Sequence, residues 1–157
     1  CFWILTIFMN LIAKNKKAYF DYEIIKTYEA WIELKWYEVK SIRNKHINLK
    51  WSYVSCISWT LYAKSIHIGV LKNLSNKSSI DPLVERKIFL HKKEIYFLCN
   101  KIKESWFSII PLELYFSGSL VKIRIWLVRW RKLFQKRQLL KERTLEKEAK
   151  MKLLKFI

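Results

Sequence analysis

Glycine and proline are scarce in this chain, which has 2 of each among 157 residues. Ordinary proteins contain about 7% glycine, so most turns here must be made by other residues. The 3 cysteines, Cys1, Cys56 and Cys99, are far apart, odd in number and without C-x-x-C spacing. We therefore expect no disulfide framework, no zinc site and a reducing cytoplasm as the location. The 3 histidines are equally scattered, so we expect no metal, no cofactor and no Cys/His catalytic pair.

Acidic residues are also few. The chain has 13 Asp and Glu against 31 Lys and Arg, a net charge of +18. Such an excess attracts a polyanion, because binding releases the counterions of the partner. Nucleic acid is the first candidate and an anionic membrane surface the second. Hydrophobic residues make up 52% of the chain, which favours one folded domain over wholesale disorder.

The apolar segment at residues 1–12 (CFWILTIFMNLI) is too short to cross a membrane as a helix, which takes about 20 residues. It also lacks the leading positive charge and the small cleavage-site residues of a signal peptide. Because Met9 follows a start on Cys1, we predict that residues 1–8 are an upstream extension. Residues 9–128 are then the folded domain and residues 129–157 a basic tail.

Hydrophobic patterning predicts a small, mainly antiparallel β-barrel with intercalated helices. Alternation and β-branched residues indicate strands, and apolar spacing at three and four residues indicates helices. We predict strands at 18–28 and 31–35, a helix at 37–45, a hairpin of 52–57 with 60–68, a mobile loop at 71–81, a helix at 91–104, and a hairpin of 107–116 with 119–129. Pro111 interrupts the last hairpin, which suits an edge or a bulge.

The final predicted strand has two different faces. Val121, Ile123, Ile125 and Leu127 alternate with a set that contains Lys122, Arg124 and Trp126. This pattern indicates a buried face backed by a basic one.

The tail differs in character from the rest of the chain. Residues 129–157 hold 11 Lys and Arg against 3 Asp and Glu, a local net charge of +8, with no glycine or proline. Their apolar residues form no continuous stripe before Met151. We expect a segment that is disordered alone and helical on a polyanion. A solvated helix packed on the barrel is the alternative.

Tryptophan, in contrast, is abundant, with 8 residues. Several stand where a turn or a strand end is expected, among them Trp31, Trp36, Trp59 and Trp106. One explanation is an aromatic platform on which nucleic-acid bases stack. The other is that these positions belong to glycine, which accepts positive φ without penalty.

Seven segments resemble the SmpB (small protein B) family in order, from about Asn10 to the end of the chain. They are residues 15–22 (NKKAYFDY), 28–31 (YEAW), 36–43 (WYEVKSIR), 48–54 (NLKWSYV), 81–92 (DPLVERKIFLHK), 111–116 (PLELYF) and 130–137 (WRKLFQKR). The resemblance implies a mainly β fold, an OB-like antiparallel β-barrel with one to three short helices and a basic C-terminal tail, disordered or helical. It also implies binding to the tRNA-like part of transfer-messenger RNA (tmRNA) and delivery of that RNA to stalled ribosomes.

The departures from the family pattern concern mostly one residue type. Tryptophan replaces the family's glycine at Trp31, Trp36, Trp106, Trp126 and Trp130, and stands at Trp51 and Trp59 where glycine is common. Our hypothesis is that UGA codons, read as glycine in some bacteria, were translated as tryptophan. Two further departures are Gln135 in place of an aspartate and Val84 in place of an arginine.

The resemblance and the charge pattern together give candidate contact residues. Basic groups either supply phosphate contacts or are simply solvated. Tyr53 or Tyr22 stacks an unpaired base or belongs to the core. Glu29 and Glu38 accept hydrogen bonds from base amino groups, or begin a helix or pair with a lysine, and Asn48 bonds to RNA or caps a turn. The expected RNA-binding residues are Asn15, Lys16, Lys17, Glu29, Glu38, Lys40, Ser41, Arg43, Asn48, Lys50, Tyr53 and Lys92. The tail residues expected to bind the ribosome, in the empty message channel, are Arg131, Lys132, Lys136, Arg137, Lys141 and Arg143.

Three other functions remain open. A structural RNA-binding or ribosome-associated protein shares the charge and the fold. A peripheral membrane protein would use residues 1–12 and the tail. An RNA-processing enzyme needs a catalytic cluster, and the sequence offers only Asp21, Glu23 and Glu29, which share a face only if their strand is unbroken. We expect a monomeric protein that is not an enzyme, with tmRNA and the small ribosomal subunit as partners and no membrane.

Overall fold

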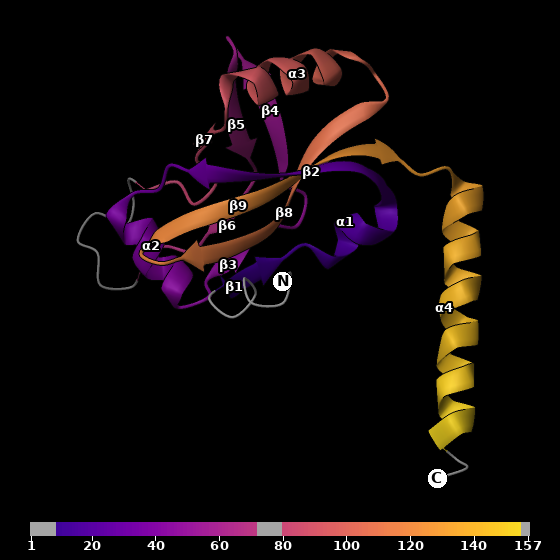
Figure 1. The fold of residues 1–157 in the computed structure, drawn as a ribbon. Helices are drawn as coiled ribbons and strands as arrows, with labels where there is room; N and C mark the ends of the chain where they lie inside the picture. The colour runs from indigo at the N-terminus through magenta and orange to yellow at the C-terminus, as the bar shows by residue number, and fades with distance from the viewer. Residues whose placement is uncertain (1–8, 72–79, 155–157) are drawn as a thin grey trace.

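The computed structural model describes residues 9–71 and 80–154 (Figure 1). Residues 1–8, predicted to be an upstream extension, and most of the loop predicted at 71–81 lie outside these ranges. The strands are β1 (Met9–Lys14), β2 (Tyr22–Ile32), β3 (Ile47–Asn48), β4 (Tyr53–Ile57), β5 (Thr60–Lys64), β6 (His67–Ile68), β7 (Arg86–Phe89), β8 (Phe107–Ser117) and β9 (Leu120–Trp130). The helices are α1 (Lys16–Asp21), α2 (Trp36–Arg43), α3 (Lys92–Lys103) and α4 (Leu133–Leu154).

Six strands close into a barrel. The hydrogen-bonded order is β8-β4-β5-β7-β2-β9, and β9 pairs again with β8. Strand β1 pairs with residues 113–117 of β8, beyond the pairing of β8 with β4 at Ile109. Every pairing of the described strands is antiparallel. Closure leaves few exposed edges, as small barrels require. The predicted fold class, an OB-like antiparallel barrel with short helices and a basic tail, is confirmed.

The barrel core follows from alternation along its strands. In β9, Val121, Ile123, Ile125 and Leu127 point inward and are buried, as predicted. The opposite face is not uniformly basic, because Trp126 and Val128 are also buried, in a second cluster under α1. The Trp126 ring meets Tyr19 of α1 edge-on, with 4.4 Å between centroids. Helix α1 therefore covers one end of this outer face.

Most predicted elements are confirmed, including α2, α3 and both hairpins, with bounds that shift by a few residues. The separate strand predicted at 31–35 is wrong, because β2 continues to Ile32 and residues 33–35 are not in a strand. Pro111 lies at a bulge of β8, where the register with β9 shifts between Pro111 and Glu113, as its missing N–H requires. The predicted strand at 18–28 is wrong in its first part, because residues 16–21 form α1. The cause is local: the side chain of Asn15 accepts a hydrogen bond from the Ala18 amide and so begins a helix.

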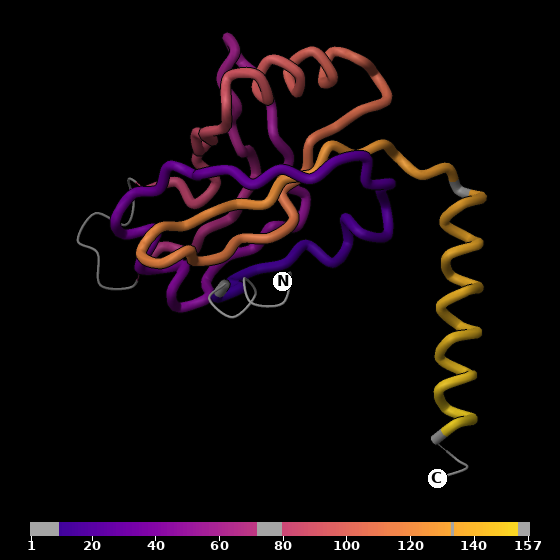
Figure 2. The backbone as a smooth tube through the Cα atoms, in the orientation of Figure 1, coloured from indigo at the N-terminus to yellow at the C-terminus, as the bar shows by residue number. Residues whose placement is uncertain are grey.

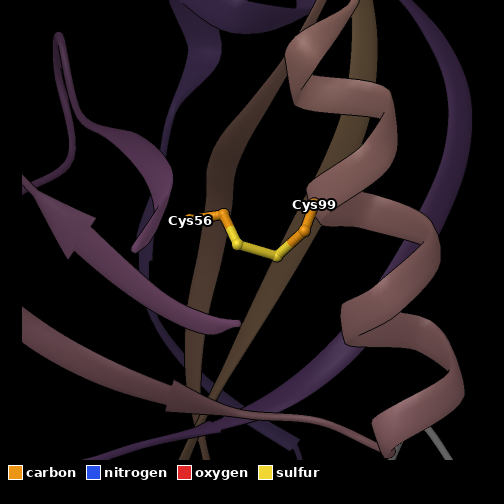
Figure 3. The surroundings of a disulfide bond; sticks show 2 residues. All are labelled: Cys56 and Cys99. Carbon is orange, nitrogen blue, oxygen red and sulfur yellow. A yellow bond between two sulfur atoms is a disulfide. The ribbon is translucent and has the colours of Figure 1, made fainter. Parts of the chain in front are cut away.

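The expectation that the cysteines stay unpaired is also wrong. Cys56 of β4 and Cys99 of α3 form a disulfide, with 5.5 Å between their Cα atoms (Figure 3). Their separation of 43 residues hid the pair from spacing rules. The disulfide joins α3 to the barrel wall, beside the buried Leu98.

The tail is helical and projects away from the barrel (Figure 2). Helix α4 has 22 residues, nearly all exposed. The last strand reaches Trp130, two residues beyond the predicted end of the folded domain. The distribution of apolar residues explains the projection, since α4 offers no continuous stripe that a barrel could bury.

Candidate nucleic-acid interface

Three of the polar residues predicted to contact RNA are buried and organise the surface from below: Asn15, Glu38 and Ser41. Asn15 donates from its side-chain amide to the carbonyls of Leu49 and Pro111, at 3.1 and 3.4 Å. It therefore ties the start of α1 to the 49–52 turn and to β8. The first two residues of α1, Lys16 and Lys17, are consequently presented to solvent.

Glu38 is only 5% exposed and is used inside the protein. One carboxylate oxygen accepts from Nε and Nη2 of Arg86, at 2.8 and 2.7 Å. The other accepts from the backbone amide of Lys35 at 2.8 Å, which caps α2. The prediction that Glu38 bonds directly to RNA is therefore corrected, since its oxygens are occupied and buried.

Arg86 is a residue that sequence reasoning missed. It is 3% exposed and also donates to the carbonyls of Ile66, Val84 and Pro82. Arg86 lies two residues before the buried Ile88 in β7 and therefore on the same, inward face of the strand, which was a usable signal. An arginine at an inward-facing strand position needs a buried hydrogen-bond acceptor, and in this structure Glu38 supplies it.

Ser41 likewise holds a structural contact, because its hydroxyl donates to the carbonyl of Gly69. This bond fixes α2 against the segment after β6. Lys40 and Arg43 lie on the solvent side of the same helix, and the Arg43 guanidinium is 5.8 Å from the Phe116 ring centroid. Helix α2 thus offers two cations on a firmly held support.

The 49–53 segment brings several predicted residues together. Asn48 accepts from the Lys50 amide at 2.9 Å through its side chain, and Tyr53 is 45% exposed. The Lys17 ammonium lies 3.5 Å from the ring centroid of Trp51. A hollow beside this group is lined by Asn15, Lys17, Ala18, Asp21, Tyr22, Trp51, Ser52, Tyr53, Ser108 and Ile110. Cations next to an exposed tyrosine are the combination that binds unpaired nucleotides.

Glu29 belongs to a network on the outer face of the barrel. The Arg124 guanidinium joins Glu29 at 3.1 Å and Glu113 at 2.7 Å, and Lys14 joins Glu113 at 3.0 Å. Partial burial raises the pKa of Glu29, but the hydrogen bond from Arg124 and the positive charge of its guanidinium outweigh burial, so the pKa is lowered overall. Burial and the Glu29 carboxylate raise the pKa of Tyr115 to about 12. Glu29 is thus ionised at neutral pH and partly exposed, able to accept from a base.

Lys92 is exposed at the start of α3 and lines a different hollow, with Trp59, Ile95 and Tyr96. It is therefore not grouped with Lys17 and Tyr53. The Trp59 and Tyr96 rings are stacked, with 5.1 Å between centroids.

Helix α4 is tied to the barrel at its base. Arg131 donates to the Tyr22 carbonyl at 2.8 Å, and Lys136 pairs with Asp21 at 2.9 Å. The Arg143 guanidinium lies 5.5 Å from the Phe20 ring centroid. Lys132, Arg137 and Lys141 are exposed. Two of the six predicted tail cations, Arg131 and Lys136, therefore anchor the helix as well as charging it.

Two further features of residues 9–71 and 80–154 concern membrane spanning and metal binding. Within these ranges, no helix is long and apolar enough to cross a membrane. The same residues contain no group of three or more His, Cys, Asp or Glu side chains placed to hold a metal ion.

A closed barrel with cationic helices, exposed tyrosine and a basic helical arm defines a nucleic-acid-binding protein of the OB-like class. The family model described as "SmpB protein" matches residues 12–155. The chain therefore belongs to the SmpB protein family.

Known relatives and a solved structure agree with this assignment. The SsrA-binding protein of Mycoplasma mycoides subsp. mycoides is 40% identical over 139 residues, 88% of this chain and 94% of the relative. That of Helicobacter hepaticus is 42% identical over 143 residues, 90% and 92% of the two chains. A solved structure described as "tmRNA-SmpB: a journey to the center of the bacterial ribosome" aligns with a TM-score of 0.65 and 34% identity, covering 77% of this chain and 85% of that one.

Proposed function

We propose that this protein binds the tRNA-like part of tmRNA through its barrel and delivers that RNA to stalled ribosomes. The observation that carries the proposal is the hollow at α1 and the 49–53 segment, which Lys17 and Tyr53 line. The Lys50 ammonium lies 5.8 Å from the ring centroid of Trp51, which lines the same hollow. Lysines there neutralise phosphates without reading sequence, and Tyr53 stacks an unpaired base. The names of the relatives, SsrA-binding proteins, support this partner.

The tail then enters the message channel of a ribosome that lacks message. A helix of 22 residues is about 33 Å long at roughly 1.5 Å per residue, so it reaches well beyond the barrel. Message phosphates normally lie in this channel, and when they are absent the phosphates of ribosomal RNA stabilise the cationic helix. Occupancy of the channel therefore depends on whether message is present, and the protein discriminates between ribosomes without catalysis. We place it in the cytoplasm because its proposed partner, the ribosome, works there; the cysteines do not support this location, since Cys56 and Cys99 are paired. We also propose that it is a monomer.

The test is peptide tagging on stalled ribosomes in a reconstituted system. Removing residues 138–157 keeps the anchors Arg131 and Lys136 and is expected to leave tmRNA binding intact while abolishing tagging. Two double variants test the charge of the tail. K141Q/K147Q removes two positive charges and is expected to reduce tagging, whereas K141R/K147R keeps them and is expected to preserve tagging. Full tagging by the shortened chain would contradict the role of the tail.

A structural RNA-binding protein is the competing function. It shares the surface but binds intact ribosomes whether or not message fills the channel. Equal retention of the protein on message-loaded and message-free ribosomes would favour this alternative.

A further inference from the structure

Two tight turns of the barrel place a tryptophan where the backbone has the left-handed conformation. Trp51 has φ of 66° and Trp59 has φ of 60°. This region is uncommon for any residue with a Cβ atom, and for a bulky side chain it is an outlier. Both indoles lie largely in solvent, 67% and 52% exposed, so burial of the rings does not compensate for the backbone conformation.

The type of turn at residues 57–60 also favours glycine at position 59. Ser58 and Trp59 are the two central residues of the β4–β5 hairpin, between the paired Ile57 and Thr60, and both have positive φ. This is a type I′ turn, whose second central position strongly prefers glycine. The β8–β9 hairpin does carry glycine at positive φ, Gly118 with φ of 63°.

Residues 49–52 form a turn in which the Ser52 amide donates to the Leu49 carbonyl at 3.2 Å, and Trp51 is its third residue. Among residues 49–52, Trp51 alone has positive φ. That combination is typical of a type II turn, in which the third position is a glycine position. Within residues 9–71 and 80–154, the other non-glycine residues with left-handed φ are Lys45, Ser58 and Ser65, which are flexible or small and carry no ring at the Cβ atom.

We propose that glycine occupies positions 51 and 59 in the protein as its own cell makes it. The route is a UGA codon that the cell reads as glycine. The inference rests on the backbone at these two turns and on the shortage of glycine, 2 residues against 8 tryptophans.

The consequence concerns the surface near α1 and rests on the proposed function. The Trp51 ring lies against the Lys17 ammonium and lines the hollow beside Tyr53. Glycine at 51 removes the ring, widens the hollow and releases Lys17 toward an RNA phosphate. Glycine at 59 lies at the other hollow and leaves Lys17 as it is.

The first test is direct. Mass spectrometry of peptides from the protein purified from its own cells is expected to show glycine at positions 51 and 59. The gene is expected to carry UGA codons at both positions. Tryptophan in those peptides, or UGG in the gene, would overturn the proposal.

The second test uses the chain with tryptophan at positions 51 and 59. W51G and W59G are each expected to raise the Tm by several degrees, because each relieves a left-handed backbone. W51A and W59A are the matched controls, since they remove the exposed ring but keep a Cβ atom, and they are expected to gain much less. Equal gains for alanine and glycine would attribute the effect to the ring and overturn the backbone argument.

Measuring the affinity of each variant for tmRNA distinguishes a failure of this inference from a failure of the proposed function. W51G is expected to bind tmRNA several-fold more tightly than the chain with tryptophan at both positions. W59G is expected to bind tmRNA with the same affinity as that chain. Failure of every variant to bind tmRNA would remove the proposed function, while peptide masses and melting temperatures would still decide which residue stands at 51 and 59.

Discussion

The buried pair of Arg86 and Glu38 gives the clearest prediction at the scale of single residues. Each partner is nearly inaccessible to solvent, so removing one leaves an uncompensated charge. R86A is expected to lower the free energy of unfolding by about 3–5 kcal/mol. The double variant R86A/E38A is expected to cost clearly less than the sum of the two single changes. Denaturant unfolding measures all three, and additive losses would contradict a paired interaction.

Glu113 provides a pH prediction. Burial raises the pKa of its carboxyl, but Lys14, Tyr19 and Arg124 outweigh burial and lower it overall. The stabilisation is therefore complete above the ordinary pKa of about 4.3 and is lost as pH falls through the lowered value. E113Q is expected to cost about 1–3 kcal/mol at pH 7, and the difference from the unmodified protein should vanish in acid. If the two proteins still differ in free energy of unfolding below pH of about 2, the ionised Glu113 carboxylate is not the source of the stabilisation.

The sequence located the exposed cations but not the buried polar contacts. Lys16, Lys17 and Lys50 could be assigned to the surface because a solvated lysine needs no partner. The roles of Asn15 and Glu38 could not, because they depend on residues 34 and 48 positions away. Long-range partners of this kind are set by barrel closure, which no local pattern contains.

The disulfide links the two elements whose relation the sequence left undetermined, β4 and α3. A cross-link closing 43 residues restricts the unfolded chain and is worth about 4 kcal/mol in the chain-entropy model. We expect a reductant to lower the Tm of the oxidised protein measurably. C99A should abolish the response to reductant, whereas C1S should retain it. An unchanged Tm on reduction would argue against a stabilising cross-link.

Helices and hairpins were predictable where the apolar period was unambiguous, as in α3 and in β8–β9. The strand predicted at 18–28 failed in part because its aromatic residues fit a short helix equally well, and the Asn15 cap decides between them. The tail illustrates the reverse case. Composition predicted a segment that is disordered alone and helical on a polyanion, whereas the structure shows a helix without one. The anchoring of this helix through Arg131 and Lys136 depends on the carbonyl of Tyr22 and the carboxylate of Asp21.

At the scale of the whole molecule, the net charge of +18 should make RNA binding steeply dependent on salt. Each phosphate neutralised contributes a slope of roughly −0.7 to −0.9 in the logarithm of the binding constant against the logarithm of salt concentration. K16Q/K17Q is expected to flatten that slope by about 1–2, whereas the control K45Q, away from the hollow, should change it less. Filter binding at several salt concentrations measures both. Equal flattening by the two variants would mean that charge acts nonspecifically.

The central claim is that the barrel recognises tmRNA and not RNA in general. The most direct measurement is filter binding of the full chain to tmRNA and to an ordinary tRNA, side by side across a salt series. We predict tighter binding to tmRNA at every salt concentration, with the preference growing as salt weakens nonspecific contacts. Equal affinity for the two RNAs throughout the series would contradict the claim and leave a nonspecific basic barrel.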